Sequence, residues 1–263
     1  MTPTSAPTPG SQRAWVRHHL SSHHLFSAYL FAESAQEIEQ AGNTGEYQRL
    51  RHRSLVIGSV MSSVAFLEAA INELYVVCAD HPGDIHVMGH PQDERFGCIG
   101  NDIIQMLGAL WQLEIFRRSA NLLEKCQTAL RLARREEFDK GANPYQDAKL
   151  AVDLRNLLVH FKPEVRQIAM GAGNRLPPDF FESTYRSKFE ENPLLVKITV
   201  GGTPGGPLEL DSPFFPERCL GSGCAQWAFR SMLAFTNEMF RRLGTAWYYH
   251  WLFDKAMIPQ STT

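Results

Sequence analysis

The sequence predicts an all-α protein, a helical bundle with a small β-hairpin insertion. Apolar residues recur at helical spacing over most of the 263 residues. One stretch late in the chain is β-branched and is followed by a Gly/Pro-rich loop, which is typical of a hairpin. A chain of this length can bury a substantial core, and a bundle with one hairpin is the simplest arrangement of these elements.

The N-terminal third is expected to contain a tail and two helices. Residues 1–12, MTPTSAPTPGSQ, are rich in Thr, Pro and Ser and lack the apolar segment of a signal peptide, so we expect a disordered tail. Residues 13–263 would then form a single helical domain. A first helix is predicted over Ser11–Gln40, with a break near Ser21, and the turn AGNTGE follows. A second helix is predicted over Arg51–Ala79, where these apolar residues repeat at helical spacing: Leu55, Val60, Val64, Leu67, Ile71, Leu74 and Cys78.

The middle of the chain is expected to hold a long loop and two further helical regions. Residues 80–97 carry no periodicity and are predicted to form a loop. Helical pattern resumes near Cys98 and continues to about Lys140, with a bend near Gly108, until GANP stops it. The next helix is predicted over Pro144–Phe161, because the residue before a proline is disfavoured in a helix and Pro163 follows.

The character of the sequence changes after Gly171. Residues 171–216 are expected to form a loop and the hairpin, with LLVKITV as one strand and GGTPGGPLEL after it. A C-terminal helix is predicted over residues 221–255, and it is unusually aromatic, as buried helices often are. Its aromatic residues are Trp227, Phe229, Phe235, Phe240, Trp247, Tyr248, Tyr249 and Trp251.

Composition excludes some classes of protein and favours the cytosol. The formal net charge is −2, so the chain lacks the overall basic field that many nucleic-acid-binding proteins carry. We expect no apolar run to be as long as a membrane span, and we therefore predict no membrane contact and a cytoplasmic location. The five cysteines form no C-x-x-C pair and are expected to be buried free thiols rather than disulfides or metal ligands: Cys78, Cys98, Cys126, Cys219 and Cys224.

The stretch DLRNLLVH carries the main polar candidates on the helix predicted over residues 144–161. At about 100° per residue, the large apolar side chains of this helix form one stripe: Leu150, Leu154, Leu157, Leu158 and Phe161. Arg155 and His160 flank that stripe about 140° apart, and Val152 and Val159 are expected to point away from it. The two polar residues of one straight helix therefore do not converge, but two copies of the helix could bring them together across a two-fold axis.

Both polar residues also have an ordinary structural explanation. A histidine in the last turn of a helix interacts favourably with the helix dipole. An arginine at the edge of a core can extend its charged end to solvent. On geometry alone, this explanation stays open beside a catalytic one.

A second polar pair lies in the helix over Arg51–Ala79. Glu68 and Asn72 are four residues apart and share a face, inside an otherwise apolar run. A carboxylate at the edge of a core needs a partner, and Arg155 is the expected one. Glu68 would then either form a structural ion pair or orient a catalytic arginine.

The motif Arg-x4-His in RNLLVH, at the end of a helix, together with LEAAINELY in an earlier helix, resembles the HEPN superfamily (higher eukaryotes and prokaryotes nucleotide-binding domain). The resemblance covers residues 51–163, and the hairpin is not part of the family pattern. It implies a HEPN-like helical bundle that forms a homodimer through the 144–161 helix. It further implies a metal-independent endoribonuclease without a cofactor, with RNA as substrate, in which Arg155, Asn156 and His160 act catalytically and Glu68, Asn72 and Asp153 support them.

By analogy, such a nuclease would serve as a toxin or in phage defence, with an antitoxin protein as a further partner. The alternative within the same family is a non-catalytic nucleotide-binding or protein-interaction module. A third alternative is a purely structural helical protein that assembles through its aromatic C-terminal helix.

Other chemistries find less support in the sequence. His18, His19, His23 and His24 lie close together, but no glutamate completes a zinc motif. A second group in the 80–97 loop matches no known metal-ligand spacing: His81, Asp84, His86, His90 and Asp93. The glycine-rich stretches GAG, GGTPGG and GSG lack the strand, lysine and helix that a phosphate-binding loop requires. No metal site is therefore predicted.

Basic residues gather near one face of the helical region predicted from Cys98 to Lys140. Arg117, Arg131 and Arg135, with Lys125 beside them, are candidates for contact with an RNA backbone. Glutamates interleave with them, so a solvated face with ion pairs is the alternative.

Overall fold

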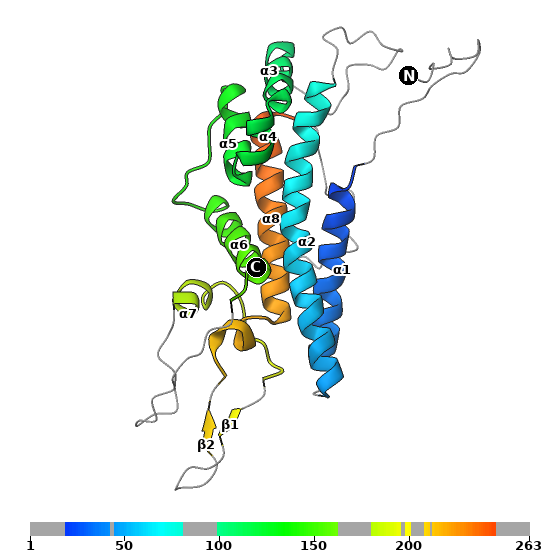
Figure 1. Ribbon diagram of the computed structural model, residues 1–263, viewed down its shortest axis with the longest axis vertical. Helices are drawn as coiled ribbons and strands as arrows, with labels where there is room; N and C mark the ends of the chain where they lie inside the picture. The colour runs from blue at the N-terminus through cyan, green and yellow to red at the C-terminus, as the bar shows by residue number, and fades with distance from the viewer. Residues whose placement is uncertain are drawn as a thin grey trace, which may run out of the picture.

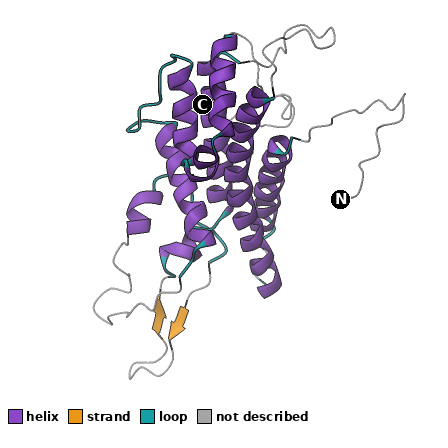
Figure 2. Cartoon of the chain, turned by 45° about the horizontal axis from the view of Figure 1, so that its top comes forward, coloured by secondary structure: helices purple, strands orange, loops and turns teal. Residues whose placement is uncertain are grey.

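The computed structural model describes residues 19–42, 45–80, 99–162, 180–195, 198–200, 208–210 and 212–245. Over these residues the chain is predominantly helical, and two short strands lie at one end of the bundle (Figure 2). The prediction of a helical bundle is confirmed. The predicted tail, residues 1–12, and the predicted start of the first helix lie outside the described residues.

Three long helices form the body of the bundle: α1 over Ser21–Gln40, α2 over Glu46–Ala79 and α8 over Ser222–Leu243. They lie side by side, with α1 running opposite to α2 and α8 (Figure 1). The apolar spacing of α2 explains its central place, because most of its turns contribute a fully buried side chain to the core. Those side chains include Val56, Val60, Val64, Leu67, Ile71, Leu74 and Tyr75.

Carboxylates from neighbouring helices hold the N-termini of α1 and α8. Glu73 of α2 accepts hydrogen bonds from the backbone N–H groups of Leu20 and Ser21, at 2.8 and 2.9 Å. Glu39 of α1 accepts one from the N–H of Ser222 at 2.7 Å and another from its hydroxyl. A helix N-terminus leaves N–H groups unpaired and favours negative charge, so these contacts fix where two long helices begin.

The helical region predicted from Cys98 to about Lys140, with a bend near Gly108, is divided into three shorter helices, and its last residues are not helical. They are α3 over Asn101–Gln112, α4 over Glu114–Ser119 and α5 over Leu122–Leu132. Gly108 lies inside α3, which continues through it without a break. The breaks fall at Leu113 and Ala120, whose backbones are extended.

Side-chain contacts explain where α5 begins and ends. Asn121 caps its start by accepting a hydrogen bond from the N–H of Leu123 at 3.0 Å. Its end is set by Arg134, which adopts the left-handed conformation (φ 53°) that usually falls to glycine. Gln127 then exchanges two hydrogen bonds of 2.9 Å with the backbone of Phe138, which keeps the segment after α5 extended against the helix.

Helix α6 spans Tyr145–Val159, close to the prediction, but it buries a different face. The buried side chains are Tyr145, Ala148, Ala151, Val152 and Leu154, whereas Leu150, Leu157 and Leu158 are only partly buried and Phe161 is exposed. Val152 was expected to point away from the core, and it is buried instead. The reason is that small alanines let α6 approach α8 closely, so they define the contact face although larger leucines lie beside them.

The remaining elements are two short helical segments and two short strands. Helix α7 spans Phe180–Tyr185, and a helical turn spans Phe214–Arg218. Strands β1, Ile198–Val200, and β2, Leu208–Leu210, pair antiparallel with Ile198 opposite Leu210.

Helix α8 ends earlier than predicted. Gly244 follows Leu243 in the left-handed conformation (φ 76°), the usual glycine stop. The helix therefore does not continue to residue 255 in one piece, and Trp247, Tyr248, Tyr249 and Trp251 lie outside the described residues.

One helix in the described part of the chain, α2, is long and apolar enough to cross a membrane by length and composition. We expected no apolar segment of membrane-span length from the sequence, and α2 shows that this expectation was wrong. Half of its apolar 18-residue window is buried against other helices, which is compatible with the core helix of a soluble protein.

Candidate functional site

The predicted contact between Arg155 and Glu68 is present. Arg155 Nη2 of α6 lies 3.7 Å from Glu68 Oε2 of α2, and the two side chains are 27% and 53% exposed. The Nε of Arg155 is shielded from solvent and has no hydrogen-bond partner among the described groups. The guanidinium therefore lies between helices, where Ala148, Ala151 and Val152 share its face at helical spacing.

Asn72 and Lys125 extend this contact into a polar cluster. Lys125 Nζ of α5 donates hydrogen bonds to Asn72 Oδ1 at 3.1 Å and to the backbone oxygen of Arg117 at 3.0 Å. Only 6% of Lys125 is exposed, and its burial lowers its pKa, although the nearby Glu68 carboxylate acts in the opposite direction. Arg155, Glu68, Asn72 and Lys125 together are called the interhelical cluster below.

Lys125 was grouped with the solvent-facing basic residues on sequence, and that placement was wrong. It points inward, and its ammonium lies 5.6 Å from the centre of the Trp111 ring. The sequence around Lys125 could have predicted its burial, because its neighbours Leu123, Cys126 and Leu130 all belong to the buried face of α5. A lysine within such a face is expected to find partners inside the protein.

The other three candidates of α6 lie apart from this cluster. His160 is exposed and caps the helix, its N–H donating to the oxygen of Asn156 at 2.9 Å. Asn156 is exposed, and Asp153 pairs with Lys149 at 2.8 Å on the solvent side. Within one chain, Arg155 faces α2 while His160 faces solvent, in keeping with the 140° separation expected from spacing.

Two exposed apolar side chains flank His160. Val159 is 48% exposed and Phe161 is 49% exposed. The Phe161 ring also lies 5.9 Å from that of Phe215, which fixes its position beside the end of α6. Large contiguous apolar patches mark interaction surfaces, and these two side chains supply exposed apolar area on both sides of His160.

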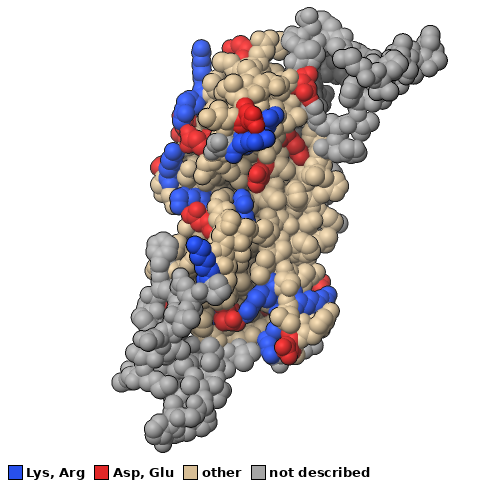
Figure 3. Space-filling model, in the orientation of Figure 1, with Lys and Arg blue, Asp and Glu red and all other residues tan. Residues whose placement is uncertain are grey.

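The three RNA-backbone candidates do not form one helical track. Arg117 belongs to α4, Arg131 to α5, and Arg135 follows α5. Arg131 is held by Glu137 through two hydrogen bonds of 2.9 and 2.8 Å. Figure 3 shows basic and acidic side chains interspersed on the face that it presents. The alternative of a solvated face with ion pairs fits Arg131 best.

The histidine and cysteine candidates show no joint site in the described part of the chain. No group of three or more His, Cys, Asp or Glu side chains there could hold a metal ion. His19 lies 3.3 Å from Glu73, His23 is exposed, and His18 and the 80–97 group lie outside the described residues. Four cysteines are buried free thiols as predicted: Cys78, Cys126, Cys219 and Cys224. Cys98 lies outside the described residues.

Comparison with known proteins does not identify a family or a function for this chain. The chain matches no protein-family model, no curated protein and no solved structure. The HEPN resemblance thus depends on the residues RNLLVH and LEAAINELY and on the helical bundle that contains them.

Proposed function

We propose that the chain is a HEPN-like, metal-independent endoribonuclease whose site forms between two copies at the end of α6. The observation that carries the proposal is the exposure of His160 between the apolar side chains of Val159 and Phe161. A second copy packed on this apolar surface would bury it and would bring a second α6 close to His160. The proposed setting is the cytoplasm, in a toxin-like or phage-defence role with an antitoxin partner.

The proposed reaction is transesterification of RNA. The ribose 2′-oxygen forms a bond to the adjacent phosphorus and the bond to the 5′-oxygen breaks. The departing 5′-oxygen takes up a proton from solvent water, so the products are a cyclic phosphate and a 5′-hydroxyl. His160 accepts the proton of the 2′-hydroxyl as the general base, a role that histidine side chains commonly take in enzymes. Arg155 neutralises the charge on the phosphorane-like transition state, and Asn156 positions a phosphate oxygen.

Glu68, Asn72 and Asp153 support the site indirectly in this proposal. Glu68 reaches the Arg155 guanidinium from α2, and Asn72 reaches Lys125 in the same cluster. A guanidinium held between helices loses less side-chain entropy when a phosphate arrives. Asp153 lies nearly two turns before the end of α6, beside Lys149.

The second candidate function is a non-catalytic HEPN-like nucleotide-binding or protein-interaction module. Arg155 and His160 point in different directions from α6, which favours this non-catalytic function. The Arg155 guanidinium reaches a carboxylate of its own chain rather than the surface around His160. In this case Arg155 braces α6 against α2, and His160 with its apolar neighbours contacts a partner.

The decisive experiment separates these functions by subunit mixing. Single-stranded RNA is incubated in EDTA with the wild type, Arg155→Ala, His160→Ala and an equal mixture of both variants after joint refolding. For the nuclease, both variants lose cleavage. If each site takes its arginine and histidine from different chains, the mixture regains roughly a quarter of the wild-type rate, because half of its dimers carry one intact site of two.

Two outcomes contradict the nuclease. Equal cleavage by all four samples indicates a contaminant, and cleavage by none of them leaves the non-catalytic module as the better account. Arg118→Ala is the matched control, because Arg118 is 74% exposed on α4 and pairs with Glu114 of the same helix. Its cleavage is expected to equal that of the wild type.

A further inference from the structure

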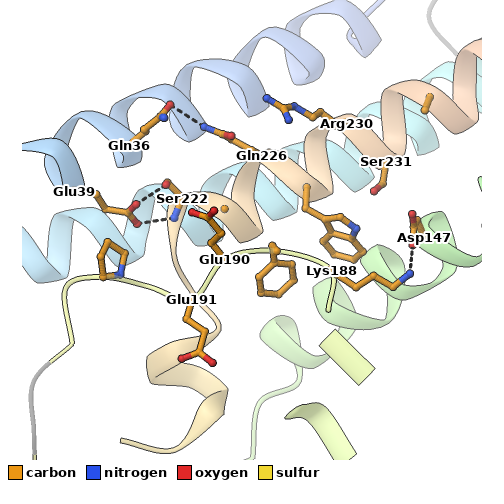
Figure 4. A pocket seen from close by; sticks show the side chains of 15 residues that line it. Gln36, Glu39, Asp147, Lys188, Glu190, Glu191, Ser222, Gln226, Arg230 and Ser231 are labelled. Atoms are coloured by element: carbon orange, nitrogen blue, oxygen red, sulfur yellow. Dashed lines mark hydrogen bonds and ion pairs between the residues drawn. The ribbon is translucent and has the colours of Figure 1, made fainter. Parts of the chain in front are cut away.

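A groove runs between α1, α8 and the segment of residues 186–195, and the first turn of α6 closes one end of it (Figure 4). Its volume is about 640 Å³, within the usual range for small-molecule sites. It contains none of the residues of the interhelical cluster and none of the residues around His160. Its function is therefore separate from the proposed nuclease.

The wall formed by residues 188–192 is held firmly against α8. A Cβ atom on Gly223 would lie 2.9 Å from the backbone oxygen of Glu190, so only glycine allows this approach. The N–H of Asn192 donates to the oxygen of Arg218 at 2.8 Å, and its side chain accepts from the N–H of Leu194 at 3.0 Å. The Glu190 side chain is thus presented from a fixed backbone.

Most charges that line the groove are already paired. Lys188 Nζ lies 2.6 Å from Asp147, and Glu191 receives two hydrogen bonds from Arg218. Glu39 accepts hydrogen bonds from Ser222 at the start of α8, and its Oε1 lies 2.7 Å from Nε2 of His52. These groups shape the walls, and they have little capacity left for a ligand.

Two charges remain, one of each sign. In the described part of the chain, Glu190 and Arg230 have no hydrogen-bond or ion-pair partner. Figure 4 shows them on different walls, with Arg230 on the side of α1 and Glu190 on the segment that faces it. A ligand that satisfies both must carry an anionic and a cationic group.

Aromatic and amide groups line the space between them. The rings of Phe189 and Trp227 lie 5.4 Å apart, and the Gln36 and Gln226 amides are joined at 2.8 Å. The Nε1 of Trp227 has no acceptor among the described groups. An unpaired buried donor is costly, and an acceptor supplied by a ligand after a small movement of the ring would offset that cost.

We propose that this groove binds a small zwitterion of the short-peptide class. The ammonium group pairs with Glu190, the carboxylate pairs with Arg230, and an apolar side chain packs on Phe189 and Trp227. A divalent cation would find only one uncommitted carboxylate, and a polyphosphate would meet one arginine opposite a glutamate. The peptide class matches both charges and the aromatic wall.

The proposal is tested by calorimetric titration with the dipeptide Leu-Phe, its N-acetyl form and its C-terminal amide. The wild type is expected to bind the free dipeptide roughly tenfold more tightly than either blocked form, since each blocked form lacks one charge pair. The Glu190→Gln variant should bind the free dipeptide and the N-acetyl form equally well, but should still prefer the free dipeptide to the amide. The Arg230→Gln variant should bind the free dipeptide and the amide equally well, but should still prefer the free dipeptide to the N-acetyl form.

The matched controls are Glu136→Gln and Arg118→Gln, two exposed residues outside the groove, which should bind like the wild type. Thermal melts of all variants check that they are folded. The proposal is overturned if the free dipeptide gives no saturable heat at concentrations on the order of 10 mM. It is also overturned if folded Glu190→Gln and Arg230→Gln keep both preferences, because the charges would then play no part.

Discussion

Arg155 Nη2 lies 3.7 Å from Glu68 Oε2 across the contact between α6 and α2. The pair joins the helix that carries RNLLVH to the helix that carries LEAAINELY, the two stretches on which the HEPN resemblance depends. The contact is loose and Glu68 is more than half exposed, so water screens much of the attraction. It orients Arg155 more than it stabilises the fold.

Glu68→Gln should therefore cost little stability. We expect the free energy of unfolding to fall by less than about 1 kcal/mol, the usual range for exposed ion pairs. Chemical denaturation of the variant and of Arg118→Gln, which breaks an exposed pair on α4, should give similar losses. A loss above about 3 kcal/mol would show that the pair behaves as a buried one in solution.

Glu39→Gln should destabilise the protein at neutral pH by about 1–3 kcal/mol, because this carboxylate accepts from His52 and from the start of α8. Burial alone would raise the pKa of Glu39, but the bonds from His52 and Ser222 outweigh it and lower the pKa. Its stabilisation is therefore complete above the ordinary pKa of about 4.5 and is lost as the pH falls through the lowered value.

The measurement is urea denaturation of the wild type and Glu39→Gln from neutral pH down to the acid range. The difference between them should shrink on the acid side. Glu37→Gln, an exposed change on the same helix, should leave the acid dependence unchanged. A constant difference between the wild type and Glu39→Gln across this range would contradict the prediction.

Lys125→Met should change how stability depends on alkaline pH. Burial lowers the pKa of Lys125, so the folded protein releases this proton below the ordinary value of about 10.5. Between the lowered pKa and that value the unfolded chain binds more protons, and this group makes stability rise with pH. The free energy of the wild type minus that of the variant should therefore increase from neutral to alkaline pH.

Denaturant titrations across that range provide the test. Lys140→Met is the control, because Lys140 is 62% exposed, and its difference from the wild type should stay level. A level difference for Lys125→Met as well would mean that the ammonium is solvated in solution.

Gly108→Ala should lower the free energy of unfolding by about 1–3 kcal/mol, the usual cost of forcing extra atoms into a packed contact. A Cβ atom at this position would lie 2.7 Å from the oxygen of Cys78 and 2.8 Å from the Cα of Ala79, both backbone atoms of α2. Thermal denaturation followed by circular dichroism measures the effect.

Gly58→Ala serves as the comparison, because the atoms nearest to its new Cβ belong to the Phe31 ring, the first at 3.0 Å, and a side chain can turn away. The smaller loss is expected there, since alanine also favours the helix. The reverse order of the two melting temperatures would show that α3 moves away from α2 more easily than Phe31 rotates.

Local pattern predicted the long helices, but it missed α7, which lies in the segment expected to be loop and hairpin. Apolar spacing placed α2 and α6 within a few residues of their bounds, and it placed the start of α8 within one residue. The same pattern related Glu68 to Asn72 on one face and suggested Arg155 as the partner of Glu68. These properties follow from side-chain periodicity, which each helix carries within its own sequence.

The tertiary structure alone decided which faces meet and where several helices stop. Close approach through Ala148 and Ala151 set the buried face of α6, and an arginine, not a glycine, took the left-handed position after α5. Lys125 turned inward because Asn72 and the backbone of Arg117 offered acceptors there.

The groove between α1 and α8 is also a product of the tertiary structure. Its residues come from segments nearly two hundred positions apart, as the bond between Gln36 and Gln226 shows. Periodicity within one helix carries no information about the distance between two helices, and that distance determines which polar groups find partners. The sequence by itself thus determined the helices and their polar candidates, and packing decided which candidates share a site.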